Sequence, residues 1–400
     1  MNTSPASRTN AIVFYAAIIL LGLNLRPIMA AVGPLLEMMQ GRIGLTDVQA
    51  GLLTTIPVFA MGAVGLLGGV VQSRLGVRHA ILLACLFIAV GNGLRWPWHS
   101  TDGLLITAAL GGTGIAIIQA LTPTYIKQSP TGDAGRGMAL FTTGIMGGAA
   151  LASASVAPIA QTTDWPFSLA LWAVPAILAI AIWSGATRRH SPEPGARAYT
   201  LPWRCGRAWF LMLFFGIGTA AYTLVLAWLP PFYVQHGWSA ASSGLLLGGL
   251  TICQVASGLI LSSIITRFPD RRRLLAVILG LICVGLLMLI IAPNQLAIPA
   301  ILVIGVAIGS LFPLSLIVSL DHLDTAAAAS SLMGFVQGGG YIIASAMPLL
   351  AGAIRGMFSS LDIAWLVMVV ALLAQIAMVP RLRPSDRLEP VTWTLKTGRH

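Results

Sequence analysis

One charged side chain lies deep inside an apolar stretch of this sequence, and its chemistry decides what that stretch can do. Arg26 is the single charged residue within residues 11–36, a run long enough to cross a bilayer as a helix. A charge at the centre of such a helix costs about 2.5–3.5 kcal/mol on insertion scales, so we expect it to face a cavity or a partner. Gly22, Ala30 and Gly33 share its helical face and leave room beside it. The guanidinium predicts a site for an anionic or strongly dipolar solute; the alternative is a structural arginine bonded to helix carbonyls.

The residue after Arg26 is expected to bend this helix. Pro27 has no N–H, and its ring crowds the carbonyl of Leu23 in the preceding turn. Proline is one of the few identifiable causes of a sharp kink in a long helix. We therefore expect a bend directly beside the charge.

Uncharged polar side chains recur in the other apolar runs. With Arg26, the predicted substrate-binding residues are Asn24, Gln119, Tyr222, Trp228, Gln254, Gln337 and Tyr341. Each offers a donor or an acceptor where an unsatisfied polar group costs several kcal/mol. For Tyr222 and Gln254 the alternative is a hydrogen bond that holds two helices together, worth about 0.6 kcal/mol.

Groups for covalent or metal chemistry are missing from these runs. No Asp, Glu or His lies deep in any of them, and the carboxylates nearest to an interior are Glu37 and Asp321. The four cysteines form no Cys-x-x-Cys or Cys/His pattern, and no phosphate-binding loop motif is present. The sequence therefore predicts no catalytic residue, no metal, no cofactor and no direct use of ATP. A proton relay through the bundle is not expected, although Glu37, Asp321 and His322 could titrate at the cavity mouths.

The elements that position these residues are membrane-spanning helices. The chain is 57% hydrophobic and 9% charged, whereas soluble domains carry about 25% charged residues. The apolar runs lie near residues 11–36, 46–72, 79–98, 101–125, 135–160, 167–187, 207–234, 239–266, 274–293, 296–320, 327–353 and 362–380. This predicts an all-α membrane protein of twelve spans in two six-helix bundles, residues 1–187 and 207–380. A polar, proline-bearing linker, 188–206, joins the bundles, and a tail, 381–400, follows them.

The two predicted bundles repeat one another in sequence. Residues 44–53 resemble residues 237–246, and at the same spacing Arg74 matches Arg267 and Gly112 matches Gly305. A parallel duplication of six spans places the substrate site near the membrane midplane, between the halves.

The basic residues predict the orientation of the chain. With twelve spans, nearly all Lys and Arg residues fall on the side of the termini and the 188–206 linker, whereas only Arg42, Arg95 and Arg355 fall on the opposite side. Cytoplasmic loops carry such an excess, so we expect both termini in the cytoplasm. The net charge of +11 is thereby explained without binding to nucleic acid.

The segment after the second run carries a recognisable motif. Gly69, Arg74, Gly76 and Arg78 resemble the loop signature between helices 2 and 3 of the major facilitator superfamily, with Ser73 where that signature has an aspartate. The resemblance implies a gating loop; the alternative is that these arginines only anchor the loop in the cytoplasm.

Further segments resemble the cyanate and 2-nitroimidazole transporter branch of this superfamily, with the spacing found in its cyanate transporters. They are residues 23–27, 32–36, 114–120, 227–233, 270–272 and 320–322. The resemblance implies twelve helices, alternating access and a secondary transporter of a small polar or anionic, cyanate-like solute. It also implies a monomer in the lipid bilayer of a bacterial cytoplasmic (inner) membrane. One alternative is export of small planar heteroaromatic compounds, and a membrane-embedded sensor or enzyme is the alternative from another class.

Overall fold

The computed structural model describes residues 5–128, 133–186, 201–268, 270–320 and 326–383. All regular structure within these residues is helical, and twelve helical segments are long and apolar enough to cross a membrane. The predicted all-α fold with twelve spans is confirmed. Asp321, His322, most of the 188–206 linker and most of the 381–400 tail lie outside the described residues.

The first half of the chain forms the helices α1 to α8. Their bounds are α1 (Pro5–Leu23), α2 (Pro27–Ala30), the 3-10 turn η1 (Gly33–Leu35), α3 (Leu36–Ile43), α4 (Asp47–Gly93), α5 (Thr101–Gln128), α6 (Ala134–Thr162), α7 (Trp165–Ala170) and α8 (Ala173–Ala186). Here α4 contains two spans, and the first span consists of α1, α2, η1 and α3.

The second half forms α9 to α14. Their bounds are α9 (Gly206–Gln235), α10 (Ala240–Ile264), η2 (Ile265–Arg267), α11 (Arg272–Ile291), α12 (Ala297–Leu320), α13 (Ala326–Phe358), α14 (Asp362–Met378) and η3 (Val379–Arg381).

The span ends differ from the prediction by at most five residues, except at the end of the first span. The first span continues to Ile43 instead of ending near residue 36, because α3 extends it with a polar turn that hydropathy does not detect. The helix of the eleventh span continues to Phe358 instead of ending near residue 353, which places Arg355 inside α13. Both extensions lie at the same end of the molecule.

The sequence repeat reappears as a repeated local structure. Gly44 ends α3 with φ 69°, and Gly237 follows α9 with φ 87°, a backbone region that favours glycine. Thr46 then caps α4 by accepting from the Gln49 N–H at 3.2 Å, and Ser239 caps α10 by accepting from the N–H three residues on at 3.1 Å. The matched segments thus form the same turn between the first and second span of each half.

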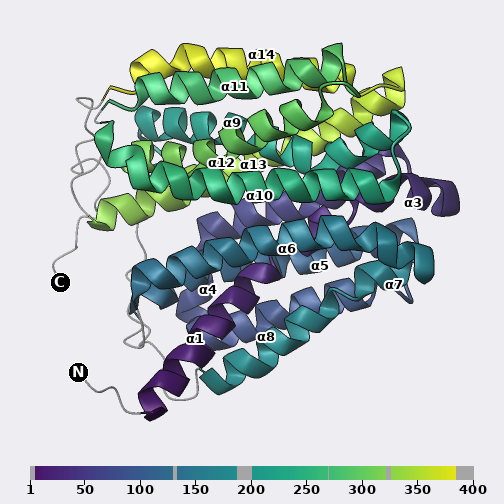
Figure 1. Cartoon of the computed structure of the whole chain (residues 1–400). Coiled ribbons are helices and arrows are strands. Elements are labelled where there is room, and N and C mark those ends of the chain that lie inside the picture. The colour runs from purple at the N-terminus through teal and green to yellow at the C-terminus, as the bar shows by residue number, and fades with distance from the viewer. Residues whose placement is uncertain (1–4, 129–132, 187–200, 269, 321–325, 384–400) are drawn as a thin grey trace.

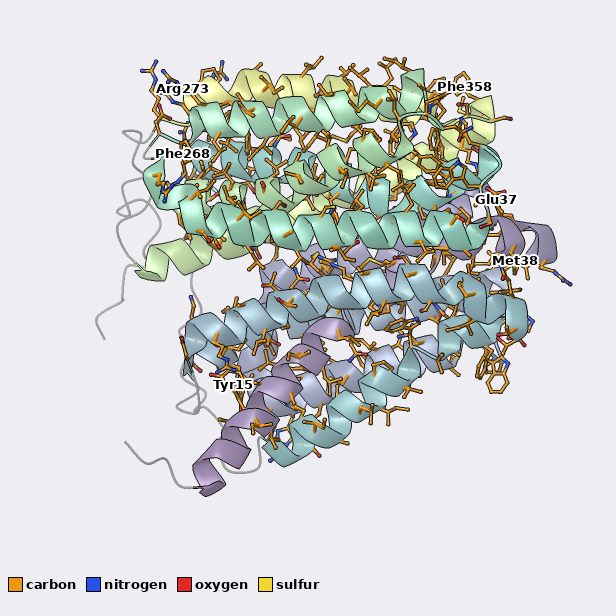
Figure 2. All side chains as sticks on the ribbon, in the orientation of Figure 1. Tyr15, Glu37, Met38, Phe268, Arg273 and Phe358 are labelled. Carbon is orange, nitrogen blue, oxygen red and sulfur yellow. The ribbon has the colours of Figure 1, made fainter. Side chains whose placement is uncertain are left out.

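The helices lie side by side in two groups, α1–α8 and α9–α14 (Figure 1). The chain enters α1 and leaves η3 at one end of the bundle, which we call the terminal end. Phe268 and Arg273 lie at this end, and Glu37 and Phe358 lie at the opposite, distal end (Figure 2).

The groups meet along two helix pairs, α4 with α13 and α6 with α10. Backbones approach closely there: a Cβ added to Gly62 would lie 2.6 Å from the Gly338 carbonyl oxygen, and one added to Gly244 would clash with the Ser153 carbonyl. In Figure 1, α6 and α10 diverge toward the terminal end. The halves are therefore packed together from the centre toward the distal end.

Candidate functional site

The first span is interrupted at Arg26. α1 ends at Leu23, α2 begins at Pro27, and the residues between them are not helical. Pro27 has no N–H to donate to the Leu23 carbonyl, and α-helical backbone bonding resumes with the Ala30 N–H, which donates to the Arg26 carbonyl at 2.9 Å. The predicted bend beside the charge is confirmed. Arg26 remains buried, with 5% of its surface exposed.

The Arg26 guanidinium contacts residues of both halves. Its Nη1 donates to Met61 Sδ at 3.6 Å, and its Cζ lies 5.5 Å from the centre of the Tyr222 ring. No carboxylate among the described residues forms an ion pair with it, and its Nε has no hydrogen-bond partner. A buried charge is normally paired and fully hydrogen-bonded, so Arg26 retains unused binding capacity.

A hydrogen bond between the halves lies next to this arginine. Gln119 on α5 donates from Nε2 to the Tyr341 hydroxyl on α13 at 2.8 Å. The Tyr341 hydroxyl also interacts with Arg26 and lies near Tyr222. Arg26, Gln119, Tyr222 and Tyr341 thus meet in one place, two residues from each half. We call them the central cluster.

The central cluster contains three buried polar atoms without a partner: Arg26 Nε, Gln119 Oε1 and the Tyr222 hydroxyl. Since about nine in ten buried polar groups in proteins are hydrogen-bonded, each such atom requires an explanation. The guanidinium can donate to an anion, and the amide oxygen and the hydroxyl can accept from a donor group. The arrangement suits a small solute with a negative or strongly dipolar end.

Two other predicted site residues lie apart from the central cluster. Asn24 donates from Nδ2 to the carbonyls of Leu20 at 2.7 Å and Pro175 at 3.1 Å, which directs it toward α8 of its own half. Trp228 donates from Nε1 to the Pro348 carbonyl at 2.9 Å, between α9 and α13. Its ring lies next to Arg355 near the distal end instead of next to Arg26.

The remaining two predicted residues lie on helices of the second half. Gln254 is buried on α10, where its backbone packs against Gly309 of α12, and its Nε2 has no partner. Gln337 is half-buried on α13, beside Gly338. No hydrogen bond connects either side chain to Arg26 within the described residues, so their role in binding stays a prediction.

The motif Gly69, Arg74, Gly76 and Arg78 lies where α4 changes direction between its two spans. Gly76 interrupts the helix with φ 67° and ψ 153°, a conformation that L residues rarely adopt. Arg78 donates from Nη2 to the Ser184 carbonyl at 3.5 Å, which connects the turn to α8 of the same half. For Gly69 and Arg74 the structure describes the backbone only, which is helical.

Two of the three arginines that the sequence assigned to outer segments, Arg95 and Arg355, are buried. Arg95 has no exposed surface; its Nη1 donates to the Ile28 carbonyl of α2 at 3.0 Å, and its Nε donates to Thr107 Oγ1 at 3.4 Å. Burial lowers the pKa of Arg95 to about 10, so it stays charged at neutral pH. Arg355 on α13 is 6% exposed and binds carboxylates of the other half. No comparable signal identifies Arg355 in the sequence, because it follows the predicted apolar run 327–353 and resembles a loop charge.

Two hollows on the surface lie away from the central cluster. One of about 560 Å³ is lined by Ile43 and residues 97–102, and one of about 400 Å³ by Phe232, Gln235, His236 and residues 359–362. Each is lined by one half only and is formed largely by turns, so neither marks a path between the halves.

Comparison with known sequences identifies relatives along most of the chain. The model of the Major Facilitator Superfamily matches residues 12–345. The cyanate transport protein CynX of Escherichia coli (strain K12) is 36% identical over 352 residues, which cover 87% of this chain and 91% of CynX. The 2-nitroimidazole transporter of the same organism is 30% identical over 357 residues, covering 87% and 90%.

Solved structures of transporters share the fold. A bacterial homologue of the human lysosomal transporter Spinster, in an inward-facing and occupied conformation, has a TM-score of 0.77 at 15% identity, covering 97% of this chain and 100% of that one. The D-xylose–proton symporter has a TM-score of 0.71 at 17% identity, covering 94% and 99%. At these identities the likeness concerns the fold.

Proposed function

This chain belongs to the major facilitator superfamily and is a multi-pass membrane transporter of that type, and from this membership we propose that it carries a small anionic or strongly dipolar solute, such as cyanate, by way of the central cluster. The observation that carries the proposal is Arg26, a buried guanidinium with no carboxylate partner among the described residues and an unpaired Nε. The relatives of this chain include a cyanate transport protein.

The binding energy would come from charge-assisted hydrogen bonds. A guanidinium offers a planar fork of N–H donors to an oxyanion or to a linear triatomic anion. Such bonds are shorter and roughly twice as strong as those between neutral groups, and water is largely excluded from a site buried between the halves. Gln119 and Tyr341, already joined to one another, would orient the solute beside Arg26.

Transport would proceed by alternating access, with residues 1–187 and 207–380 as the two moving halves and residues 188–206 as their connection. The central cluster takes two residues from each half, so separation of the halves would open it to one side at a time. All four residues belong to one chain, which is consistent with a monomer. The basic residues Arg78, Arg207, Arg273 and Arg381 support a cytoplasmic terminal end in a bacterial inner membrane.

A second candidate is export of small planar heteroaromatic compounds. The observation that favours it is the Tyr222 ring, which lies 5.5 Å from the Arg26 guanidinium and could stack on a flat solute. One relative is a 2-nitroimidazole transporter.

Counterflow into proteoliposomes would test both candidates. The panel contains cyanate, other small monovalent anions and neutral nitroimidazoles, and it is applied to the wild type, Arg26→Gln and Arg42→Gln. Arg42 is an exposed arginine of α3 and serves as the matched control for loss of one positive charge. Thermal unfolding of each variant shows whether it is folded.

We expect anion counterflow in the wild type and in Arg42→Gln, and none in folded Arg26→Gln. Removing a buried charge relieves the cost of inserting it in the membrane, so Arg26→Gln should still insert. Anion counterflow in folded Arg26→Gln would rule out the anion site. Counterflow of nitroimidazoles alone would favour the second candidate.

A further inference from the structure

Another buried arginine, Arg355, connects the two halves at the distal end. Arg355 on α13 forms an ion pair through Nη2 with Glu37 of α3 and another through Nη1 with Asp47 of α4 at 3.2 Å. Nη1 also donates to Gln40 Oε1 at 3.4 Å. Glu37, Gln40 and Asp47 belong to the first half, whereas Arg355 belongs to the second. We call Glu37, Asp47 and Arg355 the distal latch.

Residues of α9 support the arginine from its own half. With its amide oxygen turned toward the guanidinium, Gln235 accepts from Nη2 at 2.8 Å and from Nε at 2.9 Å. The Trp228 ring lies 5.5 Å from the Arg355 Cζ, and its own N–H is fixed on the Pro348 carbonyl. Arg355 is therefore held in position on one half and paired with carboxylates of the other.

The latch lies where the halves are packed together. A Cβ on Gly352 would clash with the Asp47 carbonyl, and one on Gly33 would lie 3.1 Å from the Pro230 ring. The latch joins the two halves at the distal end, and they cannot separate there without breaking both ion pairs.

The charges of the latch do not balance. Two carboxylates face one guanidinium, and within the described residues neither carboxylate forms an ion pair with another cation. His236, which follows α9, is hydrogen-bonded through Nδ1 to the Phe232 carbonyl, Asp362 of α14 accepts from the Ser360 hydroxyl, and Arg42 of α3 is exposed. When the halves separate, Arg355 leaves with the second half and both carboxylates stay on the first.

The two carboxylates would remain close to one another after separation. Glu37 on α3 and Asp47 at the start of α4 flank the same short turn, and Gln40 of α3 donates from Nε2 to Asp47 Oδ1 at 2.8 Å. Two neighbouring carboxylates without a cation favour holding one proton between them. Opening is then linked to uptake of a proton, and by reciprocity a higher proton concentration favours opening.

We propose that Glu37, Asp47 and Arg355 form a proton-coupling site at the distal entrance: the entrance opens when the ion pairs break, and the freed carboxylates take up one proton from the distal side. The proposal rests on the alternating access proposed above. The sequence predicted no proton relay through the bundle. The proposal instead has carboxylates of the protein carry the proton, and it places them at a cavity mouth, away from the solute.

Accessibility of a buried cysteine would test this. Ser153 has no exposed surface, and its Oγ lies 3.6 Å from the position of a Cβ on Gly248, in the α6–α10 contact between the halves. In a chain with its four native cysteines replaced by alanine, Ser153→Cys would be labelled with a membrane-impermeant maleimide from the distal side. Ser100→Cys, on an exposed turn at that end, corrects at each pH for the reactivity of the thiol itself.

We expect the corrected labelling rate to rise as the distal pH falls from about 8 to about 6, by at most about tenfold per pH unit, the limit for one proton. Glu37→Gln combined with Asp47→Asn should label rapidly and independently of pH. Glu37→Gln alone should also lose the pH dependence, because no second carboxylate remains to share a proton with Asp47. This variant keeps the Asp47 ion pair and serves if the double variant does not fold. Asp362→Asn, a distal carboxylate outside the latch, should behave like the wild type.

Three outcomes would overturn the proposal. A wild-type rate that does not change with pH removes the proton link and leaves alternating access intact. A pH dependence that persists in Glu37→Gln/Asp47→Asn assigns the proton to another group. If Ser153→Cys is never labelled, with or without cyanate, the distal entrance does not open and alternating access itself is wrong.

Discussion

Arg26 and Arg355 are buried to nearly the same extent, 5% and 6% exposed, yet their surroundings differ in kind. Arg355 binds two carboxylates and the amide of Gln235, so its donors are used within the protein. Arg26 has a thioether, a tyrosine ring and a tyrosine hydroxyl for neighbours, and its Nε is unpaired.

The comparison separates two uses of a buried guanidinium. A charge whose partners come from the opposite half stabilises one conformation, because separating the halves leaves it unpaired. A charge without a protein partner keeps its capacity for a ligand, at the expense of stability when no ligand is bound. Pairing, more than burial, therefore distinguishes the proposed latch from the proposed site.

Replacing each arginine by lysine should sharpen this contrast most. Arg26→Lys keeps the charge but loses the planar fork, so anion affinity should weaken by about 1.5–3 kcal/mol, roughly ten- to hundredfold, with little change in melting temperature. Arg355→Lys should lower the melting temperature and leave affinity near that of the wild type. Isothermal titration and thermal unfolding in nanodiscs measure both, and the opposite pattern would reverse the two assignments.

A double-mutant cycle between Glu37 and Arg355 tests whether the latch stabilises this conformation. We expect a coupling of about 1–2 kcal/mol in unfolding experiments, reduced by the partial exposure of Glu37. Arg355→Gln alone should be the most destabilised variant, because it leaves two carboxylates together. Additive effects of Glu37→Gln and Arg355→Gln would show that the ion pair contributes nothing.

Removing one hydroxyl at a time tests the central cluster. Tyr341→Phe loses the acceptor of the Gln119 amide and should weaken solute affinity by about 0.5–1.5 kcal/mol. Tyr222→Phe removes a hydroxyl without a protein partner and should leave the melting temperature unchanged. A clear loss of stability in Tyr222→Phe would mean that its hydroxyl serves the fold.

The smallest effect is expected from an exposed ion pair at the terminal end. Arg272 donates hydrogen bonds to Asp270 from its side chain and its backbone, which lowers the pKa of the Asp270 carboxyl to about 2. This contribution to stability is present above the unfolded value of about 3.9 and is lost as the pH falls toward 2. Because both side chains are well exposed, Asp270→Asn should cost less than about 1 kcal/mol, with no pH dependence between about pH 5 and 8. A larger change in melting temperature would give this pair a structural role.

The sequence alone determined the twelve spans, the interruption at Pro27 and the repeat of residues 44–53 in residues 237–246, which the structure shows as the same glycine turn. These features depend on residues close together in the chain: a run of apolar side chains, a missing N–H, a glycine where φ is positive. The charge of Arg26 inside such a run was enough to identify it as a candidate, because an isolated charge in the membrane costs free energy whichever helices surround it.

Only the tertiary structure decided which polar residues meet. Gln119 and Tyr341 are joined across the halves. Trp228, which also lies in an apolar run, is instead beside Arg355 near the distal end. Glu37 and Arg355 each lie at the end of a predicted span and resemble ordinary loop charges in the sequence. The two residues are 318 positions apart in the chain, so their pairing depends on how α3 and α13 approach one another. Local periodicity contains no information about that approach, because it is set by packing between the two halves.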